Sequence, residues 1–160
     1  MSINEERVAQ IEIIRLFPAR LKTAVSPLTP TQLVATPIAG EWSIAQIVHH
    51  CGDAHMNGYI RLKLMLTEDN PPIKPYAEAD WGQLPDANNP NIDTTLTLLD
   101  GLHPRWVEAL TSLSEVDWTR TGVHGYLGQL SVADIVETYA KHCQGHLAQI
   151  EQTRSALTPE

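Results

Sequence analysis

Prolines restrict the fold of this chain more than any other residue type does. Five of its 11 prolines lie between Thr67 and Asn91. Because proline has no amide hydrogen to donate, this stretch is predicted to contain neither regular helix nor a central strand. Four long segments outside it contain one proline or none and repeat apolar residues with the period of an α-helix. The chain is therefore predicted to be all-α, with long connections between its helices.

The helical segments are expected to pack as one domain. They are predicted over residues 4–25, 43–67, 92–113 and 131–156. Ser43 and Gln46 have the spacing of a capping box, which starts the second helix. Pro18 should bend or restart the first helix, and Pro104 should kink the third. The link 114–130, with three glycines, has room for a short hairpin. A chain of 160 residues supports one hydrophobic core, so the whole chain is predicted to be a single four-helix bundle with crossover connections.

The charge of the chain excludes several classes of partner. It has 11 Lys or Arg and 19 Asp or Glu, a formal net charge of −8. Nucleic acids and anionic membranes bind basic surfaces, so neither is an expected partner. Residues 1–14 are too polar for a signal peptide, and no apolar run approaches the ~20 residues of a spanning helix. A cytoplasmic protein is expected, with Cys51 and Cys143 as buried thiols and not as a disulfide.

Polar residues of the second helix lie beside its buried face. At about 100° per residue, one narrow stripe holds Gln46, His50, Asp53, Asn57 and Arg61. The apolar stripe directly beside it holds Ile44, Ile47, Cys51, Leu62 and Met65. A solvated polar face would lie opposite the apolar one, as His49 does. The polar stripe is therefore predicted to border the core, where its side chains can build a site.

The fourth helix repeats this arrangement with His142, His146 and Gln149. His142 and His146 are four residues apart, so their side chains lie one above the other and can bind one metal ion. Alone, this pair could also be two unrelated histidines, and His50 alone could be a hydrogen-bonded core residue. Together, the two helices predict a three-histidine metal site of His50, His142 and His146.

The remaining candidates surround this predicted site. Asp53 lies one turn from His50, where a buried carboxylate can hold the tautomer of a metal-binding imidazole. An outer layer around the metal, or substrate binding, is the predicted role of Gln46, Asn57, Arg61 and Gln149. His124 lies in a loop that can reach the mouth of a pocket. His55, on the apolar side of the second helix, is interpreted as structural, and His103 has no evident partner.

Two stretches of the sequence resemble the YfiT-like branch of the DinB superfamily. They are GEWSIAQIVHHCGDAHMNGYIRLKLMLTEDNPPIKPYAEADW and YAKHCQGHLAQI. The resemblance implies a four-helix bundle with a three-histidine metal site, whose first ligand is the second histidine of the His-His pair, here His50. The other two ligands match His142 and His146, and the resemblance also implies a homodimer. The family often has Trp, His and His at three positions that are not ligands, occupied here by Lys141, Gly145 and Gln149.

A three-histidine site leaves at least one coordination position open to water or substrate. One divalent metal per chain is expected, and imidazole ligands suit nickel and zinc. Such a metal lowers the pKa of bound water toward ~7, which predicts hydrolysis of a small-molecule substrate. Members of the YfiT-like branch are provisionally described as metal-dependent hydrolases, in agreement with this prediction.

Two other functions fit the same site. One is a thiol S-transferase, in which the metal binds a low-molecular-weight thiol as its thiolate and Arg61 helps to hold an acidic thiol. The resemblance supports this function, because relatives in the superfamily are thiol S-transferases or thiol-dependent isomerases. The other is a non-catalytic metal-binding or stress-response protein. No Gly-x-Ser-x-Gly turn offers a different nucleophile. The connection 67–91 is expected either to shape access to the metal or only to join two helices.

Overall fold

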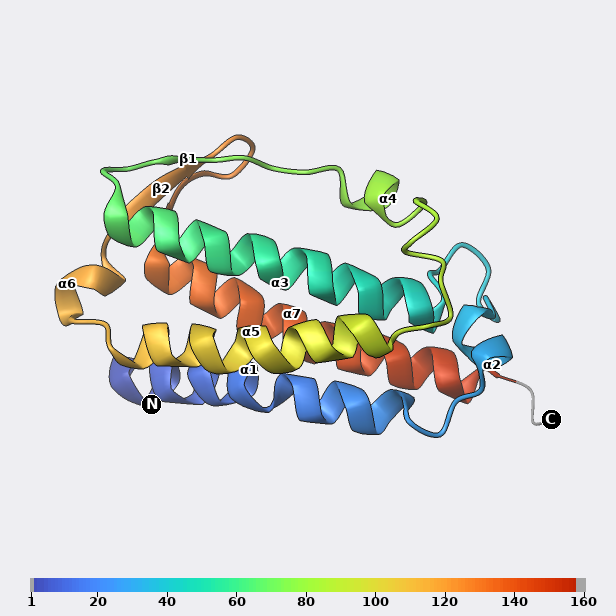
Figure 1. The fold of residues 1–160 in the computed structure, drawn as a ribbon. Helices are drawn as coiled ribbons and strands as arrows, with labels where there is room; N and C mark the ends of the chain where they lie inside the picture. Colours follow the sequence, from blue (N-terminus) through green and yellow to red (C-terminus); the bar gives the residue numbers. More distant parts are fainter. Residues whose placement is uncertain (1, 158–160) are drawn as a thin grey trace.

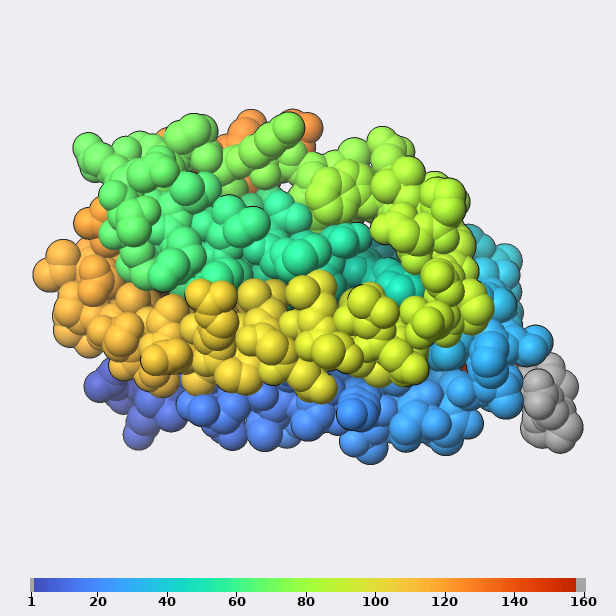
Figure 2. All heavy atoms as spheres, viewed as in Figure 1, coloured from blue at the N-terminus to red at the C-terminus, as the bar shows by residue number. Residues whose placement is uncertain are grey.

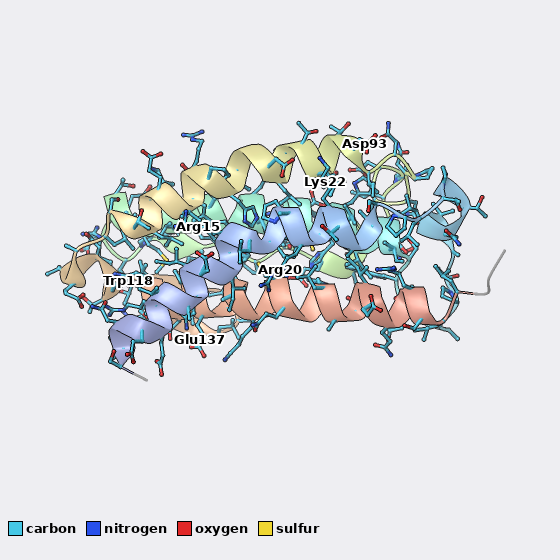
Figure 3. All side chains as sticks on the ribbon, turned by 90° about the horizontal axis from the view of Figure 1, so that it is seen from below. Arg15, Arg20, Lys22, Asp93, Trp118 and Glu137 are labelled. Atoms are coloured by element: carbon cyan, nitrogen blue, oxygen red, sulfur yellow. The ribbon has the colours of Figure 1, made fainter. Side chains whose placement is uncertain are left out.

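Four long helices form the bundle that the sequence predicts. The computed structural model describes residues 2–157, and Figure 1 shows the four helices running side by side along the molecule. Their bounds are α1 (Ile3–Val25), α3 (Ile44–Thr67), α5 (Asp93–Thr111) and α7 (Val132–Ser155). α1 packs against α5 and α7, as Figure 3 shows from below, and α3 packs against the same two helices. The prediction of an all-α four-helix bundle is confirmed.

Capping boxes fix where the two histidine-bearing helices begin. The side chain of Ser43 accepts a hydrogen bond from the amide of Gln46, and the Gln46 side chain accepts one from the amide of Ser43. Ser131 and Asp134 make the same pair of bonds at the start of α7. These bonds satisfy amides that the first turn of a helix leaves without partners. Both helices therefore begin where the sequence predicts.

α1 continues through Pro18 but changes direction in that stretch, as the sequence predicts. In Figure 3 the helix bends between the labelled Arg15 and Arg20. Pro18 has no amide hydrogen, so the carbonyl of Ile14 lacks its usual donor four residues later. That carbonyl instead accepts a hydrogen bond from Nδ1 of His103 on α5, at 2.6 Å.

The core between the helices is filled by aliphatic and aromatic side chains. Its fully buried members include Ile14, Phe17, Ile47, Leu62, Trp106 and Ile150. α3 packs tightly against its neighbours at Gly58, where a Cβ would lie 2.5 Å from Tyr139 and 2.7 Å from Trp106. Cys51 and Cys143 are buried free thiols, as predicted. Between residues 2 and 157, no helix combines the length and the apolarity needed to cross a membrane.

Short elements occupy the connections between the long helices. They are α2 (Pro30–Val34), β1 (Pro72–Ile73), α4 (Glu78–Trp81), α6 (Glu115–Trp118), β2 (Thr121–His124) and β3 (Gly128–Ser131). β2 and β3 form the predicted hairpin, and β1 pairs with β2 in parallel at the edge of the sheet, a position that tolerates proline. The single-turn helix α4 was not predicted; its four residues contain no proline and make no side-chain cap.

The connection from α3 to α5 runs back along α3. Figure 1 shows it passing from β1 at one end of α3 to α4 near the other end, and Figure 2 shows its atoms lying over those of α3. Gln46, near the start of α3, donates a hydrogen bond from Nε2 to the carbonyl of Gly82 at 2.7 Å, in a buried position. This bond fixes the middle of the connection beside the end of α3 that carries His50.

Candidate metal centre

The three predicted ligands meet between α3 and α7. Nε2 of His50 lies 3.0 Å from Nε2 of His142, and Nε2 of His146 lies 3.1 Å from the same atom. His50 is buried, and His142 and His146 are half-buried. In the described part of the chain, these three side chains form the one group of His, Cys, Asp or Glu that is compact enough to hold an ion. The structure therefore brings together the residues that the helix periodicity selected.

The spacing of these nitrogens fits a metal ion. Zinc–nitrogen bonds of roughly 2.0–2.1 Å in a tetrahedral arrangement set neighbouring nitrogens about 3.3 Å apart. The separations of 3.0 and 3.1 Å are close to that value. Over residues 2–157 no fourth His, Cys, Asp or Glu belongs to the group. A metal in this position would keep coordination sites for water or substrate.

The environment of His146 shows that a lone pair points into the group. Nδ1 of His146 lies 2.9 Å from Oε1 of Gln149, whose Nε2 donates to a carboxylate oxygen of Glu41 at 3.3 Å. A carboxylate only accepts, so the Gln149 amide turns its oxygen toward His146 and Nδ1 carries the proton. Nε2 of His146 is then an acceptor, aimed at the other two imidazoles. A lone pair directed in this way is available to a metal ion.

Burial keeps the three imidazoles neutral at pH 7. Burial, and then the charge of His146, lowers the pKa of His50 to about 4. Burial, followed by the charges of His146 and His50, lowers the pKa of His142 to about 3. Burial also lowers the pKa of His146, although its hydrogen bond to Gln149 and the charge of Glu78 act in the opposite direction. Neutral imidazole is the form that binds metal.

Two further histidines are connected to the site. Nδ1 of His142 lies 3.1 Å from Nε2 of His55, and Nδ1 of His55 lies 2.9 Å from Nε2 of His103. Both residues are fully buried. The sequence interpretation of His55 as structural and of His103 as unpartnered missed this contact with a ligand. The available signal was that a buried imidazole on an apolar helix face must find a hydrogen-bond partner.

Asp53 does not make the contact predicted for it. In residues 2–157 no hydrogen bond joins its carboxylate to an imidazole, and burial, followed by the charge of Asp86, raises its pKa. Three residues place Asp53 only about 60° from His50 around α3, but the charges that act on its carboxylate are those of Asp86 and His49. Asn57 donates to the backbone carbonyl of Asp53 at 2.9 Å and lines a cavity with Tyr76, outside the group of three histidines.

A cavity of about 310 Å³ opens at the three histidines. Its other walls are Gly40, Glu41, Trp42, Glu78 and Gln149. The ring of Trp42 meets the ring of His50 edge-on, with centroids 5.1 Å apart. Glu41, Trp42 and Glu78 were not predicted as site residues, because they lie in connections that have no periodicity to reveal their direction. A larger cavity of about 540 Å³ lies at α1, α2 and the start of α5 and contains none of the three histidines.

A second cavity, of about 240 Å³, shares His142 and Glu78 with the first. Two predicted outer residues, Arg61 and His124, line it together with Tyr76 and Tyr139. Arg61 donates to the hydroxyl of Tyr139 at 3.2 Å and to the carbonyl of Lys74 at 3.1 Å. Its Nε and the hydroxyl of Tyr76 are buried and have no partner among residues 2–157. This cavity is therefore lined by polar side chains beside His142.

Proteins of similar sequence have names that refer to a metal-dependent activity. A protein of Bacillus mycoides (strain KBAB4), provisionally named a metal-dependent hydrolase, is 41% identical over 157 residues, which cover 98% of this chain and 90% of that protein. A protein of Oceanobacillus iheyensis with the same provisional name is 44% identical over 140 residues, covering 88% of this chain and 81% of its own.

Solved structures with the same fold are also known. YfiT from Bacillus subtilis, described provisionally as a metal-dependent hydrolase with an unusual four-helix bundle topology, matches with a TM-score of 0.91 and 34% identity, over 99% of this chain and 91% of YfiT. The mycothiol-dependent maleylpyruvate isomerase matches with a TM-score of 0.71 over 94% of this chain and 63% of that one; at 14% identity this is a likeness of fold alone. A model of the DinB superfamily matches residues 14–150. Because this match agrees with the fold, the three histidines and these relatives, the chain belongs to the DinB superfamily.

Proposed function

We propose that this protein is a metal-dependent hydrolase with one divalent ion, nickel or zinc, held by Nε2 of His50, His142 and His146. The observation that carries the proposal is the convergence of these three nitrogens at an open cavity. The similarity to proteins provisionally named metal-dependent hydrolases supports the same activity. When bound by three imidazoles, such an ion lowers the pKa of a water molecule toward about 7 and so supplies hydroxide at neutral pH.

The protein side chains around the cavity have separate tasks in this proposal. Glu78 lines both cavities, so its carboxylate oxygens can accept the proton that is released when water attacks a substrate. Trp42 packs its ring against His50 and forms an apolar wall that limits the access of bulk water. Arg61 and Tyr76 line the adjoining cavity, and their side chains carry hydrogen-bond donors. The expected substrate is a small molecule with a hydrogen-bond-accepting or acidic group near the bond that is cleaved.

A thiol S-transferase is the second candidate, and the Arg61 cavity favours it. A low-molecular-weight thiol with an acidic group could place that group near Arg61 and its sulfur near His142, since both residues line the same cavity. The mycothiol-dependent isomerase of similar fold motivates this candidate. In such a reaction the thiol loses its proton, its sulfur forms a bond to an electrophilic carbon, and the bond from that carbon to its leaving group breaks, with the electron pair going to the leaving group.

The experiment compares substrate classes on protein loaded with zinc or nickel. Esters and amides are tested without thiol, and electrophiles are tested with and without a low-molecular-weight thiol. We expect turnover of an ester or amide without thiol, loss of turnover in H142A, and retained metal but reduced turnover in E78Q. E12Q, which removes a carboxylate of α1 outside both cavities, is the control. Turnover that requires the thiol would reject the hydrolase proposal in favour of the thiol S-transferase. If the metal-loaded protein turned over no substrate class, a non-catalytic metal-binding protein would be indicated.

A further inference from the structure

We infer that His55 and His103 are positioning residues that fix the tautomer of His142, with the main-chain carbonyl of Ile14 as the fixed end of the chain of hydrogen bonds. The inference rests on the proposed role of His142 as a metal ligand. It assigns a function to two buried histidines outside the group of three. It also explains why a proline lies inside α1.

The contacts form an unbroken series through the core. The carbonyl of Ile14 lies 2.6 Å from Nδ1 of His103, Nε2 of His103 lies 2.9 Å from Nδ1 of His55, and Nε2 of His55 lies 3.1 Å from Nδ1 of His142. His55 is fully inaccessible to solvent, and His103 is 1% exposed. The series therefore joins α1, α5, α3 and α7 without an exposed link, and no water competes for its inner bonds.

The carbonyl of Ile14 gives this series a single direction. A carbonyl only accepts, so Nδ1 of His103 must carry a proton. A neutral imidazole has one donor and one acceptor, so Nε2 of His103 accepts and Nδ1 of His55 donates to it. By the same reasoning, Nε2 of His55 accepts from Nδ1 of His142. Nε2 of His142 is then left with its lone pair, directed at His50 and His146.

Pro18 makes the carbonyl of Ile14 available. In an uninterrupted helix, the amide of residue 18 would donate to the carbonyl of residue 14. Pro18 lacks that hydrogen, and α1 bends in this stretch, between the labelled Arg15 and Arg20 (Figure 3). The carbonyl would otherwise be a buried acceptor without its helical donor, which is unfavourable. His103 satisfies it, and the helix defect becomes the fixed end of the hydrogen-bond series.

The hydrogen-bond partner of His142 differs in charge from many partners of metal-binding histidines. Such partners are commonly carboxylates, backbone carbonyls or waters. Here a backbone carbonyl acts through two neutral imidazoles, and burial lowers the pKa of both His55 and His103. His142 thus receives a defined tautomer without a negative charge beside it. A site of this kind keeps the full positive charge of a bound divalent ion available to polarise water or substrate.

The first measurement reads the tautomers directly in metal-free protein. Two-bond proton–nitrogen correlation spectra of protein labelled with ¹⁵N-histidine distinguish imidazoles protonated at Nδ1 from those protonated at Nε2. We expect His142, His55 and His103 all to be protonated at Nδ1. In H103F, which disconnects the series from the carbonyl of Ile14, His142 should lose this preference. A His142 protonated at Nε2 in the unmodified protein would overturn the inference, whatever the metal affinity proves to be.

The second measurement is zinc affinity by competition with a chelator. H55L removes the acceptor at Nδ1 of His142 and should weaken zinc binding by roughly 10- to 100-fold, the usual effect of losing such a partner. H55Q supplies an amide oxygen in the same region and should recover most of the affinity. H49L is the matched control, because His49 is also on α3 and also makes two hydrogen bonds, to Thr95 and to the carbonyl of Asn89. Equal affinity of H55L and H49L would contradict the inference. Absence of zinc binding in the unmodified protein would instead reject the metal site, and the tautomer spectra would still decide the inference.

Discussion

His142 differs from the other two candidate ligands because it is the central residue of the group. Its Nε2 is close to Nε2 of His50 and of His146, and its Nδ1 is bonded to His55. His146 has the Gln149 amide behind it, and His50 has the ring of Trp42 at its edge. Within the group, His142 is therefore the residue whose position depends on the largest number of other side chains.

Replacing His142 with Ala should abolish tight metal binding. The substitution removes the central nitrogen of the three, and two imidazoles on different helices bind a divalent ion much more weakly than three. The measurement is elemental analysis of protein purified with zinc or nickel and then desalted. His49→Ala is the control and should keep one metal per chain, because His49 bonds to Thr95 and Asn89 and not to the group. Full metal content in the His142→Ala variant would reject this assignment.

The buried histidines make the metal-free protein sensitive to acid. Burial lowers the pKa of His103 in the folded state to about 4, below the usual value near 6.5. The unfolded chain therefore binds a proton more readily than the folded chain between pH 6.5 and pH 4, and stability falls as the pH is lowered through this window. His103 alone should reduce the free energy of unfolding by about 2 kcal/mol between pH 7.5 and pH 5. About one pH unit above 6.5, its contribution becomes nearly constant.

Urea unfolding of the metal-free protein across this pH range checks the prediction. His103→Phe loses hydrogen bonds and is expected to be less stable at pH 7.5, but its stability should fall less steeply toward pH 5 because one buried histidine has been removed. The slope, and not the absolute stability, is the quantity to compare. Parallel slopes for the two proteins would show that His103 does not titrate differently in the folded and unfolded states.

The long helices could be predicted from sequence because their signals are local. A capping box spans four residues, and the apolar period of 3.6 residues is visible within two turns. These signals placed α3 and α7, and with them the faces that carry His50, His142 and His146. The connection between α3 and α5 has no comparable period, so the position of Glu78 beside the histidines could not be predicted. Proline content indicated only that the connection is irregular.

Pro18 links the shape of α1 to the metal site, which leads to an unusual prediction. Pro18→Ala restores an amide that can donate to the carbonyl of Ile14 and removes a residue that disfavours the helix interior. We expect the helix to straighten, with stability equal or higher, while the bond from His103 weakens. Losing one hydrogen bond of about 1 kcal/mol corresponds to a roughly fivefold loss of zinc affinity.

Thermal unfolding and zinc competition on the same preparation test this combination. Pro30→Ala is the control, since Pro30 is at the first position of α2, where a helix has no amide bond to lose. If Pro18→Ala bound zinc as tightly as the unmodified protein, the carbonyl of Ile14 would not need the proline to hold His103 in place.

The connection between α3 and α5 is expected to control access to the metal. Its middle is fixed by the bond from Gln46 to Gly82, and the rings of Tyr76 and Trp81 contact each other with centroids 4.6 Å apart. Replacing both aromatic residues with Ala should leave metal content unchanged and increase the rate at which a chelator removes the metal by roughly tenfold, since mobile loops gate access to sites of this kind. Leu84→Ala, at an exposed position of the same connection, should have no effect. An unchanged rate in a folded double variant would mean that the connection only joins two helices.

At the scale of the whole molecule, the bundle and the group of three histidines could be predicted, but the links between helices could not. His55 and His103 are 48 residues apart, and Ile14 and His103 are 89 apart; neither spacing has a periodic signature. Their contact depends on α1, α3 and α5 packing in one particular register. Asp53 shows the same limit. Its one-turn spacing from His50 predicts the side of α3 on which it lies, but not which side chains it contacts there. The homodimer and the small-molecule substrate stay predictions.

X-ray absorption spectroscopy of protein loaded with one zinc per chain tests the central claim most directly. Three imidazole nitrogens should appear as first neighbours at roughly 2.0–2.1 Å, with outer scattering from the imidazole rings and an oxygen neighbour from water at the open position. No sulfur is expected, since Cys51 and Cys143 are buried thiols outside the group of three histidines. A first shell that contains sulfur at about 2.3 Å, or only oxygen neighbours without imidazole scattering, would contradict the three-histidine site.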